Sequence, residues 1–317
     1  MPHPTPATVF VIHHGSQDYL KIAAQFVKKF GNQAILIGND AATGQICDQF
    51  YEDSQISLPL YEEFERHYVH MSTATREFEL LCFKRYFYLY EVAKQLGLDH
   101  FWMIDSDLVL TADLSKVQGH PLIQKSEAAF STPHQEDYVL ASSPHCSYWT
   151  LSGLQQFILF LGQLYQGDSR RLLDEKYTYH QIHKIPGGIC DMTALYLWQR
   201  TNLNILNLAD AHLYGLPLFD NNLNQTGNCF DHEFEMVSNV HLKKITTQNG
   251  QYQAYLGSSN TAIPVAALHF QGTAKACMAT FLKTNEITYW AYAPYAFQQY
   301  IEKRKQSLKR KLKKIIG

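Results

Sequence analysis

The sequence predicts an α/β protein whose mixed, mainly parallel sheet is flanked by helices. Two short apolar runs, Val9 to Ile12 and Ala34 to Ile37, enclose a segment with helical periodicity, and this is the pattern of a strand–helix–strand unit. A third apolar run, Phe101 to Ile104, follows a long amphipathic helical pattern. With 317 residues, 46% of them hydrophobic, the chain can fill the large core that such a sheet requires.

Two helices are predicted in this part of the chain. Apolar residues recur at helical spacing from Leu20 to Phe30, and Gly31 marks the end of that helix. A hydroxyl at Thr75 or a neighbouring residue can cap a second helix, whose apolar stripe runs from Phe78 to Leu96 and stops at Gly97. Because each helix is followed by an apolar run, helix and strand alternate as they do around a parallel sheet.

The second half of the chain has a less regular pattern. We expect a strand from Ala128 to Phe130, an apolar helix from Leu154 to Tyr165, and a helix that follows Pro186-Gly187-Gly188 and runs to about Gln199. Residues 203–260 show short apolar stretches between turns rich in Asn and Gly, and the pattern does not define their order.

Charge is distributed unevenly along the chain. The formal net charge is −2, but residues 301–317 carry eight Lys or Arg against one Glu, which leaves residues 1–300 near −9. The apolar residues of this tail fall on one helical face, so we predict a short basic amphipathic helix that binds an anionic membrane surface. A disordered solubilising tail is the alternative. The acidic body disfavours a nucleic-acid partner.

The cysteines and the apolar segments bear on the compartment. Six cysteines lie far apart without any CxxC pair, which is typical of buried thiols in a reducing compartment. No segment has the pattern of an export signal or a membrane span. We therefore expect a cytoplasmic protein, with the tail as a means of peripheral attachment to the inner face of the membrane.

An acidic pair, Asp105 and Asp107, follows the third apolar run directly, with the small Ser106 between the two residues. In open α/β sheets, ligands bind at the carboxyl ends of the strands. Two carboxylates at that edge can share one divalent cation, Mn²⁺ or Mg²⁺, which bridges them to substrate phosphates. The alternative is a solvated turn that caps the next helix, near Thr111 to Leu114.

Two short elements resemble those of a known enzyme group. The strand followed by Asp105-Ser106-Asp107 resembles the DxD element of GT-A glycosyltransferases. Residues His269 to Lys275 are similar to the HxxGxxK element of family 8 glycosyltransferases, which include glycogenin and bacterial lipopolysaccharide galactosyltransferases. Ala276 and Cys277 follow where that family usually has Pro-Trp. The resemblance implies a GT-A-like fold, with a Rossmann-like nucleotide-binding half and a less regular acceptor half.

The resemblance also implies roles for individual residues. It makes His269 the third metal ligand, lets the backbone at Gly272 approach the diphosphate, and brings Lys275 to the phosphate oxygens, while Ser106 joins the donor-binding residues. Imidazole is an ordinary metal ligand and lysine is suited to phosphate, so these roles agree with the chemistry of the side chains. As a histidine after a strand, His269 is otherwise a structural residue.

Further donor contacts are expected from two segments. In the family, a basic residue on the helix before DxD contacts the donor, and Lys84 or Arg85 occupies that place; otherwise both belong to a solvent-facing edge. The loop His13-His14-Gly15 follows the first strand, where GT-A enzymes receive the nucleotide. There we expect main-chain contact at Gly15, whereas the two histidines can also simply pack or cap.

Two more sites are assigned by their position. Ser152 and Gly153 resemble the Asn-Ser-Gly element beside the donor sugar, although Leu151 replaces the asparagine. Asp191 lies where GT-A enzymes carry an acidic residue that faces the anomeric carbon. It is the predicted catalytic residue, either as a general base or as a group that positions the sugar. The alternative role of Asp191 is the N-cap of the following helix.

The resulting hypothesis is a metal-dependent glycosyltransferase that moves a hexose from a nucleotide-diphosphate sugar, with uridine as the expected nucleotide, to a hydroxyl of a glycan or glycolipid acceptor. Residues 1–300 are the expected catalytic domain, with the donor-binding half at about 1–135 and the acceptor half at about 136–300. Two alternatives are a haloacid-dehalogenase-like phosphatase with Asp105 as nucleophile, and a non-catalytic, membrane-associated sugar-binding protein.

Overall fold

The computed structural model describes residues 5–135, 138–202, 204–238, 240–290, 292–293 and 297. Its central sheet has seven strands in the order β3-β2-β1-β4-β7-β6-β8. The strands are β1 (Thr8–His13), β2 (Gln33–Gly38), β3 (Gln49–Glu52), β4 (His100–Ile104), β6 (Ala128–Ser131), β7 (Ser143–Thr150) and β8 (Ile205–Asn207). All neighbours pair in parallel except β7, which is antiparallel to β4 and β6. The predicted mixed, mainly parallel sheet is confirmed.

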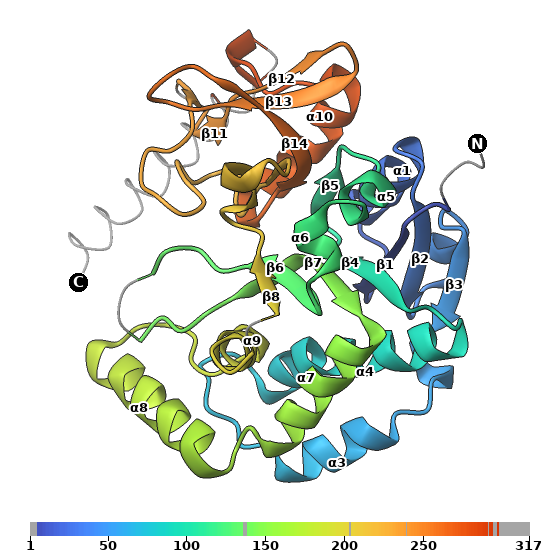
Figure 1. The fold of residues 1–317 in the computed structure, drawn as a ribbon, viewed down its shortest axis with the longest axis vertical. Helices are drawn as coiled ribbons and strands as arrows, with labels where there is room; N and C mark the ends of the chain where they lie inside the picture. Colours follow the sequence, from blue (N-terminus) through green and yellow to red (C-terminus); the bar gives the residue numbers. More distant parts are fainter. Residues whose placement is uncertain are drawn as a thin grey trace, which may run out of the picture.

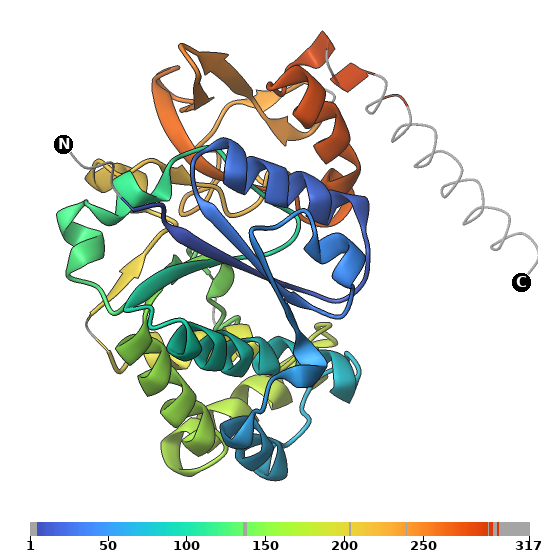
Figure 2. The same cartoon turned by 90° about the vertical axis from the view of Figure 1, so that its right-hand side faces the viewer.

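Helices cover both faces of this sheet (Figures 1 and 2). The longer helices are α1 (Asp18–Lys29), α3 (Pro59–His67), α4 (Arg76–Gln95), α7 (Leu151–Gln163), α8 (Gly167–His183), α9 (Asp191–Gln199) and α10 (Met278–Thr284). Short helical segments are α2 (Ala41–Gly44), η1 (Asp53–Gln55), α5 (Leu114–Gln118), α6 (Pro121–Gln124), η2 (Ala211–Tyr214) and η3 (Gly272–Cys277). One face of the sheet packs against α3, α4, α7 and α9, and the other against α1, α5 and part of a second sheet.

Alternation along β1 and β4 shows why both faces are covered. Phe10 and Phe101 are buried in the core under α4 and α7, whereas Val9 and Trp102 are buried in the core on the α1 side. Strands that are buried on both faces have continuous apolar sequences, because successive side chains point to opposite sides. The apolar runs in the sequence are therefore the central strands.

A second sheet carries the C-terminal part of the chain. Its path is β12-β13-β14-β5, with β9 paired to β14, and a separate pair is formed by β10 and β11. The strands are β5 (Leu108–Leu110), β9 (Leu218–Phe219), β10 (Met236–Val237), β11 (Leu242–Lys243), β12 (Ile245–Gln248), β13 (Gln251–Tyr255) and β14 (Ala262–His269). Because β5 follows β4 after three residues, the second sheet is joined directly to the carboxyl edge of the first.

Several predicted boundaries need correction. The predicted helix over 154–165 begins at Leu151, because the hydroxyl of Thr150 caps it by accepting a hydrogen bond from the N–H of Gly153. The alternative in which the acidic pair caps the next helix is wrong, since β5 intervenes and Asp113 caps α5. Strand β7 and helix α8 were not predicted, because their sequences lack a clear apolar period.

Ser152 and Gly153 lie far from the acidic pair, contrary to their predicted place beside the donor sugar. The N–H of Leu151 donates to the carbonyl of Asp99, which precedes β4, so both residues lie at the amino edge of the sheet. Asp105 follows the other end of this five-residue strand, about 16 Å away at ~3.3 Å per residue. Gly153 instead allows α7 to approach the backbone of the segment before β6.

The basic tail, residues 301–317, lies outside the described residues, so its predicted membrane helix stays a prediction. Within the described part of the chain, every helix is too short or too polar to span a bilayer. The division into donor and acceptor halves near residue 135 also stays a prediction. Strands from both halves contribute to the central sheet, since β7 lies between β4 and β6.

Gly153→Ala tests the close approach of α7. A Cβ at this position would lie 2.4 Å from the carbonyl oxygen of Glu127, so we expect overpacking to lower the free energy of unfolding by about 1–3 kcal/mol. The matched control is Ser152→Ala, at an exposed neighbouring position, which should change it by less than about 0.5 kcal/mol. Urea unfolding followed by circular dichroism measures both, and equal effects of the two variants would contradict this packing.

Candidate functional site

The carboxyl ends of β1, β2 and β4 lie at one edge of the central sheet, because these strands are parallel. Asp105 follows β4 directly, and its N–H donates to the carbonyl of His145 on β7. The chain then turns, with the N–H of Leu108 bound to the carbonyl of Asp105, and enters β5. This turn directs the chain out of the first sheet, which is what two carboxylates at i and i+2 need in order to converge.

His269 reaches the same point from the far end of the sequence. Strand β14 pairs antiparallel with β5 so that His269 lies opposite Leu108, and the N–H of Phe270 donates to the carbonyl of Asp107. One ligand atom from each of Asp105, Asp107 and His269 lies within 4.8 Å of the other two. The structure therefore brings together the three residues that were predicted as metal ligands.

The donor set fits a divalent cation. Two ligand atoms on one Mg²⁺ or Mn²⁺ ion lie at most about 4.2 Å apart, twice a bond of about 2.1 Å. A spread of 4.8 Å thus needs only a small movement of side chains. Two carboxylate oxygens and one imidazole nitrogen leave room for oxygen ligands from a phosphate, as Mn²⁺ and Mg²⁺ prefer.

The orientation of His269 is fixed by its second ring nitrogen. Nδ1 lies 2.7 Å from the carbonyl oxygen of Asn221, so Nδ1 carries the proton and donates it. Nε2 then faces Asp107, with 3.5 Å between Nε2 and Oδ1. A hydrogen bond of this kind sets the tautomer and direction of metal-binding histidines. The ring also stacks on His145, with centroids 4.3 Å apart.

Two basic side chains neutralise the acidic pair. Nζ of Lys275 lies 3.0 Å from Oδ2 of Asp107, and Nη1 of Arg85 lies 3.1 Å from Oδ1 of Asp105. Burial by itself would raise the pKa of Asp107, but the hydrogen bond and the charge of His269 in its protonated form, followed by the charge of Lys275, outweigh it and lower the pKa to about 2. Asp107 is therefore a carboxylate at neutral pH, and a cation at this point finds negative charge in place.

The two neighbouring basic residues on α4 point in different directions. Arg85 faces the cluster and also binds the carboxylate of Asp191 through Nη2. Nζ of Lys84 lies instead 5.1 Å from the ring centroids of both Tyr61 and Tyr88. Of the two predicted donor contacts on this helix, only Arg85 lies at the site, and the prediction for Lys84 is corrected.

Asp191 belongs to the same network. It is the first residue of α9, and its carboxylate accepts hydrogen bonds from Arg85 and from the hydroxyl of Tyr86, at 3.0 Å. The alternative in which it is the N-cap is wrong, because Cys190 holds that position. Asp191 is almost fully buried, at 2% exposure, so its carboxylate helps to hold Arg85 against Asp105. Its predicted catalytic role remains a prediction.

The loop after β1 lies beside the cluster. His13 is hydrogen-bonded to Gln17 and packs edge-on against the ring of Tyr19, over which Nζ of Lys275 lies at 5.2 Å from the centroid. Burial, followed by the charges of His14 and Lys275, lowers the pKa of His13. A neutral imidazole thus lies next to Lys275 at this edge of the sheet.

The other residues of this loop have structural partners. His14 lies 2.8 Å from the carboxylate of Asp53, and the N–H of Gly15 donates to the side chain of Asn39 at 2.8 Å. Gly15 has φ +102°, a conformation that favours glycine. Its N–H is thus occupied, so main-chain contact with a ligand at Gly15 requires Asn39 to move.

Gly272 and Ser106 complete the predicted set. Gly272 begins η3 with φ +60°, and a Cβ there would meet no atom within 4 Å. Glycine is therefore required for the backbone angle, and the space beside it is open. Ser106 lies partly buried in the turn between the two aspartates, and the described structure shows no hydrogen bond of its hydroxyl.

A buried ion pair behind His269 was not predicted. Asp220 follows β9, and its carboxylate accepts hydrogen bonds from the N–H of His269 and from Lys243, which also donates to Asn228 at 3.0 Å. The side chains of Asp220 and Lys243 are both fully buried. The carbonyl of Asp220 also lies 3.0 Å from Nε2 of His145. Asp220 therefore contacts both stacked imidazole residues and is itself bound by Lys243. Only the fold shows this role, because these residues are far apart in the sequence.

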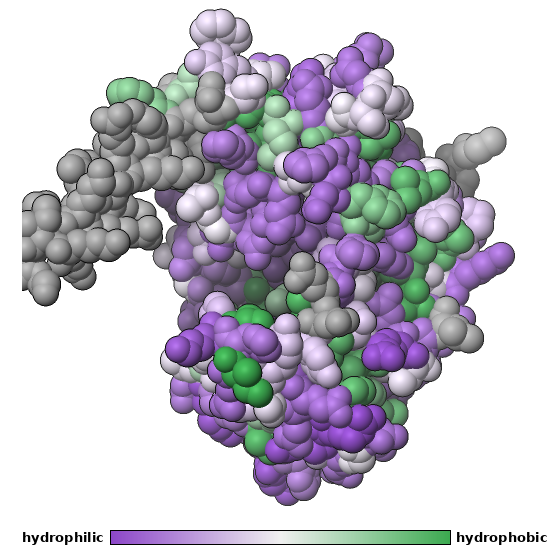
Figure 3. Space-filling model, turned by 90° about the vertical axis from the view of Figure 1, so that its left-hand side faces the viewer, coloured by the Kyte–Doolittle hydropathy of each residue, from purple (hydrophilic) through white to green (hydrophobic). Residues whose placement is uncertain are grey.

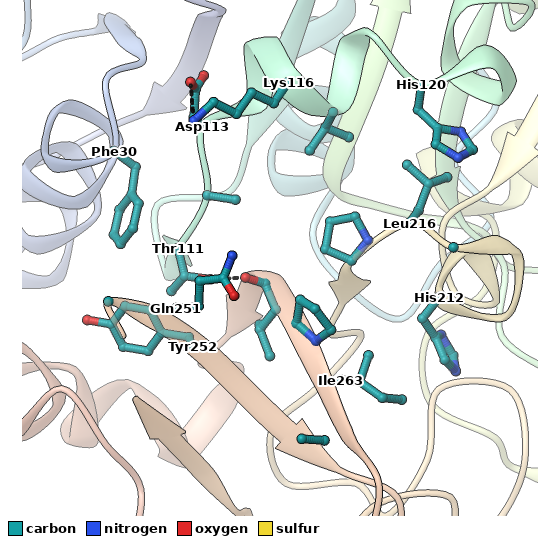
Figure 4. Close-up of a pocket in the computed structure, with 18 of the residues that line it drawn as sticks. Phe30, Thr111, Asp113, Lys116, His120, His212, Leu216, Gln251, Tyr252 and Ile263 are labelled. Carbon is teal, nitrogen blue, oxygen red and sulfur yellow. Dashed lines mark hydrogen bonds and ion pairs between the residues drawn. The ribbon is translucent and has the colours of Figure 1, made fainter. Parts of the chain in front are cut away.

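A cavity of about 810 Å³ lies next to the β5–β14 pair. It is lined by Thr111 and Val265, at the end of the pair that is remote from His269 (Figure 4). Its walls include the rings of Phe30 and Tyr252, and it is separate from the acidic cluster. The face shown in Figure 3 is largely hydrophilic and has a recess near its middle.

Comparisons with known proteins identify solved structures of similar fold but no relatives by sequence. Neither a protein-family model nor a curated protein matches the chain by sequence. Among solved structures, the chain is similar to mouse xyloside xylosyltransferase 1, with 8% identity, a TM-score of 0.47 and coverage of 65% of this chain and 86% of that chain. An active-site mutant of LgtC matches with 11% identity, a TM-score of 0.41 and coverage of 84% and 87%.

A third similar structure is a cytidylyltransferase from Leptospira borgpetersenii, with 11% identity, a TM-score of 0.30 and coverage of 57% of this chain and 74% of that chain. At this degree of likeness, the function has to be argued from the side chains of the site itself.

Lys243→Met tests the support behind His269. The substitution leaves the buried carboxylate of Asp220 without its cation, so we expect the free energy of unfolding to fall by about 3–5 kcal/mol. The control is Lys244→Met, which breaks a partly exposed pair with Glu235 and should cost at most about 1 kcal/mol. Chemical denaturation compares the two variants, and a similar small loss in both would contradict the role of the buried pair.

Proposed function

We propose that this protein is a metal-dependent glycosyltransferase that moves a hexose from a nucleotide-diphosphate sugar to a hydroxyl of a glycan or glycolipid. The observation that supports this most is the convergence of Asp105, Asp107 and His269 at the carboxyl edge of the central sheet. Lys275, a group suited to phosphate, lies beside them. This combination provides for a cation and a diphosphate at the same point.

In the proposed reaction, a hydroxyl oxygen of the acceptor forms a bond to the anomeric carbon of the donor sugar. The bond between that carbon and the diphosphate breaks, the nucleoside diphosphate leaves with the electron pair of that bond, and the hydroxyl proton passes to solvent. A bound Mn²⁺ or Mg²⁺ ion supplies Lewis-acid stabilisation of the negative charge on the departing diphosphate. Asp105, Asp107 and His269 are the residues that would hold it.

Lys275 and Arg85 have a second role in this proposal. With no donor bound, they pair with Asp107 and Asp105 and so balance two carboxylates in a partly buried site. With a cation held by the carboxylates, both basic groups would be free to contact phosphate oxygens. Gly272, which begins the same short helix as Lys275, leaves open space at its own position, as a closely approaching diphosphate needs.

The loop after β1 is the proposed nucleotide contact. His13 and Tyr19 offer ring surface next to Lys275, and the N–H of Gly15 lies at the same edge. Rings of this kind stack on bases and sugars. We also propose uridine as the nucleotide, on the basis of the sequence resemblance. A cytoplasmic location with attachment to the inner face of the membrane is proposed on the basis of the basic tail.

Asp191 is proposed to position the donor sugar through Arg85. Its buried carboxylate is bound by Arg85 and Tyr86, so it fixes the guanidinium next to Asp105. A general base has to reach the acceptor hydroxyl whose proton it removes. The carboxylate of Asp191 is buried and does not meet that condition. The proposal therefore assigns Asp191 a positioning role, and a general-base role only after movement of Arg85.

Asp107→Asn tests the cation site. We expect the wild-type protein to bind UDP in the presence of Mn²⁺, with a rise in melting temperature, because a ligand of the folded state stabilises it. In Asp107→Asn the Mn²⁺-dependent part of that rise should disappear, since one charged ligand is lost. Asp113→Asn, which retains a side chain able to cap α5, should behave as the wild type.

The measurement is a thermal-shift titration of UDP with and without Mn²⁺, followed by calorimetry for affinities. A wild-type protein that shows no Mn²⁺-dependent response to UDP or any other nucleoside diphosphate would contradict the proposed function. Release of phosphate from model esters by the wild type would instead favour the phosphatase alternative.

Lys275→Gln separates phosphate contact from metal binding. The change removes the charge beside Asp107, so the affinity for UDP in Mn²⁺ should fall about tenfold or more, which corresponds to ~1.4 kcal/mol. Binding of Mn²⁺ alone, followed by electron paramagnetic resonance, should be retained or improved, because Asp107 loses a competing cation. Lys116→Gln, at an exposed lysine remote from the cluster, is the control. Equal UDP affinity in the Lys275 variant and the control would refute this contact.

A further inference from the structure

We propose that a second cavity, next to the metal cluster, binds a neutral saccharide and is the acceptor subsite of the enzyme. The cavity has a volume of about 740 Å³ and lies between the loop after β6 and the segment from Asn221 to Asp231. This assignment rests on the proposed function. It identifies the residues that bind the acceptor and the chemical class of that acceptor.

The cavity is joined to the cluster through one residue. The carbonyl of Asn221 accepts the hydrogen bond that orients His269, while Asn221 also lines the cavity. Its neighbour Asp220 binds the N–H of His269. The cavity therefore adjoins the segment that orients a candidate metal ligand, and an acceptor that extends past Asn221 would bring a hydroxyl toward the donor sugar.

The walls of the cavity suit hydroxyl groups. Carboxamides predominate, and the described lining includes only one ordinarily charged side chain, that of Asp231. The lining carboxamides belong to Asn221, Asn224, Gln225 and Asn228. The carboxamide of Asn228 is buried and bound within the chain. Those of Asn221, Asn224 and Gln225 are partly or fully exposed, and such groups offer donors and acceptors to a sugar hydroxyl without attracting a charged group. A neutral sugar is therefore favoured over an anionic one.

An exposed aromatic ring completes the cavity. Phe230 is 61% exposed, which leaves an apolar face available for stacking on a pyranose ring. Its segment is held firmly, because the carboxylate of Glu233 accepts hydrogen bonds from the N–H groups of Asn228 and Cys229 at 2.9 and 3.1 Å. Glu233 in turn lies 2.7 Å from Nε2 of the buried His212. A ring on such a segment is presented without loss of further backbone freedom on binding.

The tight packing of this segment also depends on Gly227. A Cβ at this glycine would lie 1.7 Å from the carbonyl oxygen of Phe230, so the chain folds back on itself closely. On the opposite side, Cys229 accepts a hydrogen bond from the backbone of His134, and burial, followed by the charges of Asp210 and Glu233, raises the pKa of its thiol to about 12. The two walls of the cavity are therefore tied together.

The test compares three variants of the full chain: Phe230→Ala, Gln225→Ala and the control Phe78→Ala. Phe78 is 57% exposed on α4 and does not line the cavity, so it matches the loss of an exposed ring. The probe is an array of immobilised neutral oligosaccharides of defined structure, with UDP and Mn²⁺ present. The glycans bound by the wild type are then titrated by calorimetry.

We expect Phe230→Ala to weaken binding of the selected glycans at least tenfold and Gln225→Ala to weaken it severalfold. The affinity for UDP in Mn²⁺ should stay within twofold in all three variants, which also shows that they are folded, and Phe78→Ala should bind glycans as the wild type does. Unchanged glycan binding in both cavity variants, or binding of no neutral glycan by a wild type that binds UDP and Mn²⁺, would overturn the subsite. Failure of the wild type to bind UDP with Mn²⁺ would instead reject the proposed function.

Discussion

The antiparallel pairing of β5 with β14 is the constraint on which the candidate site depends. It fixes His269 opposite Leu108, so an imidazole from near the end of the chain faces a carboxylate that follows the central strand β4. Hydrogen bonds in a strand ladder set this register, and a shift by one residue would turn the side chain of His269 to the opposite face. The candidate metal ligands therefore exist as a group only while both sheets are joined.

The balance of charge in this site affects both the stability of the fold and the binding of a ligand. Three carboxylates, those of Asp105, Asp107 and Asp191, lie near two cations, Arg85 and Lys275, in a partly buried site. Burying like charges together is unfavourable unless opposite charges are supplied. The basic residues stabilise the fold without a ligand, and the same groups are suited to a diphosphate. In the proposed function, the basic side chains exchange their contacts with the carboxylates for contacts with the diphosphate, so donor binding leaves no charge unpaired.

The cavity beside Asn221 is formed by a segment that also supports His269. One backbone carbonyl orients His269, while the adjoining segment presents carboxamides and the ring of Phe230 to solvent. The buried carboxylate of Asp220 joins that segment to β14 of the second sheet, and Lys243 on β11 binds both Asp220 and Asn228. The proposed donor and acceptor regions thus share hydrogen-bonded support, which favours a reactive distance between two bound substrates.

The sequence by itself determined strands β1, β2, β4 and β6, helices α1, α4, α7 and α9, and the acidic pair, because these depend on local apolar periodicity and on residues adjacent in the chain. It also identified His269 and Lys275 through a motif. Only the tertiary structure decided that Arg85 and not Lys84 faces the cluster, that Ser152 and Gly153 lie at the opposite edge, and that Asp220 and Lys243 lie behind His269. Such facts depend on the rotation of a helix and on strand pairing between distant segments, which local patterns do not encode.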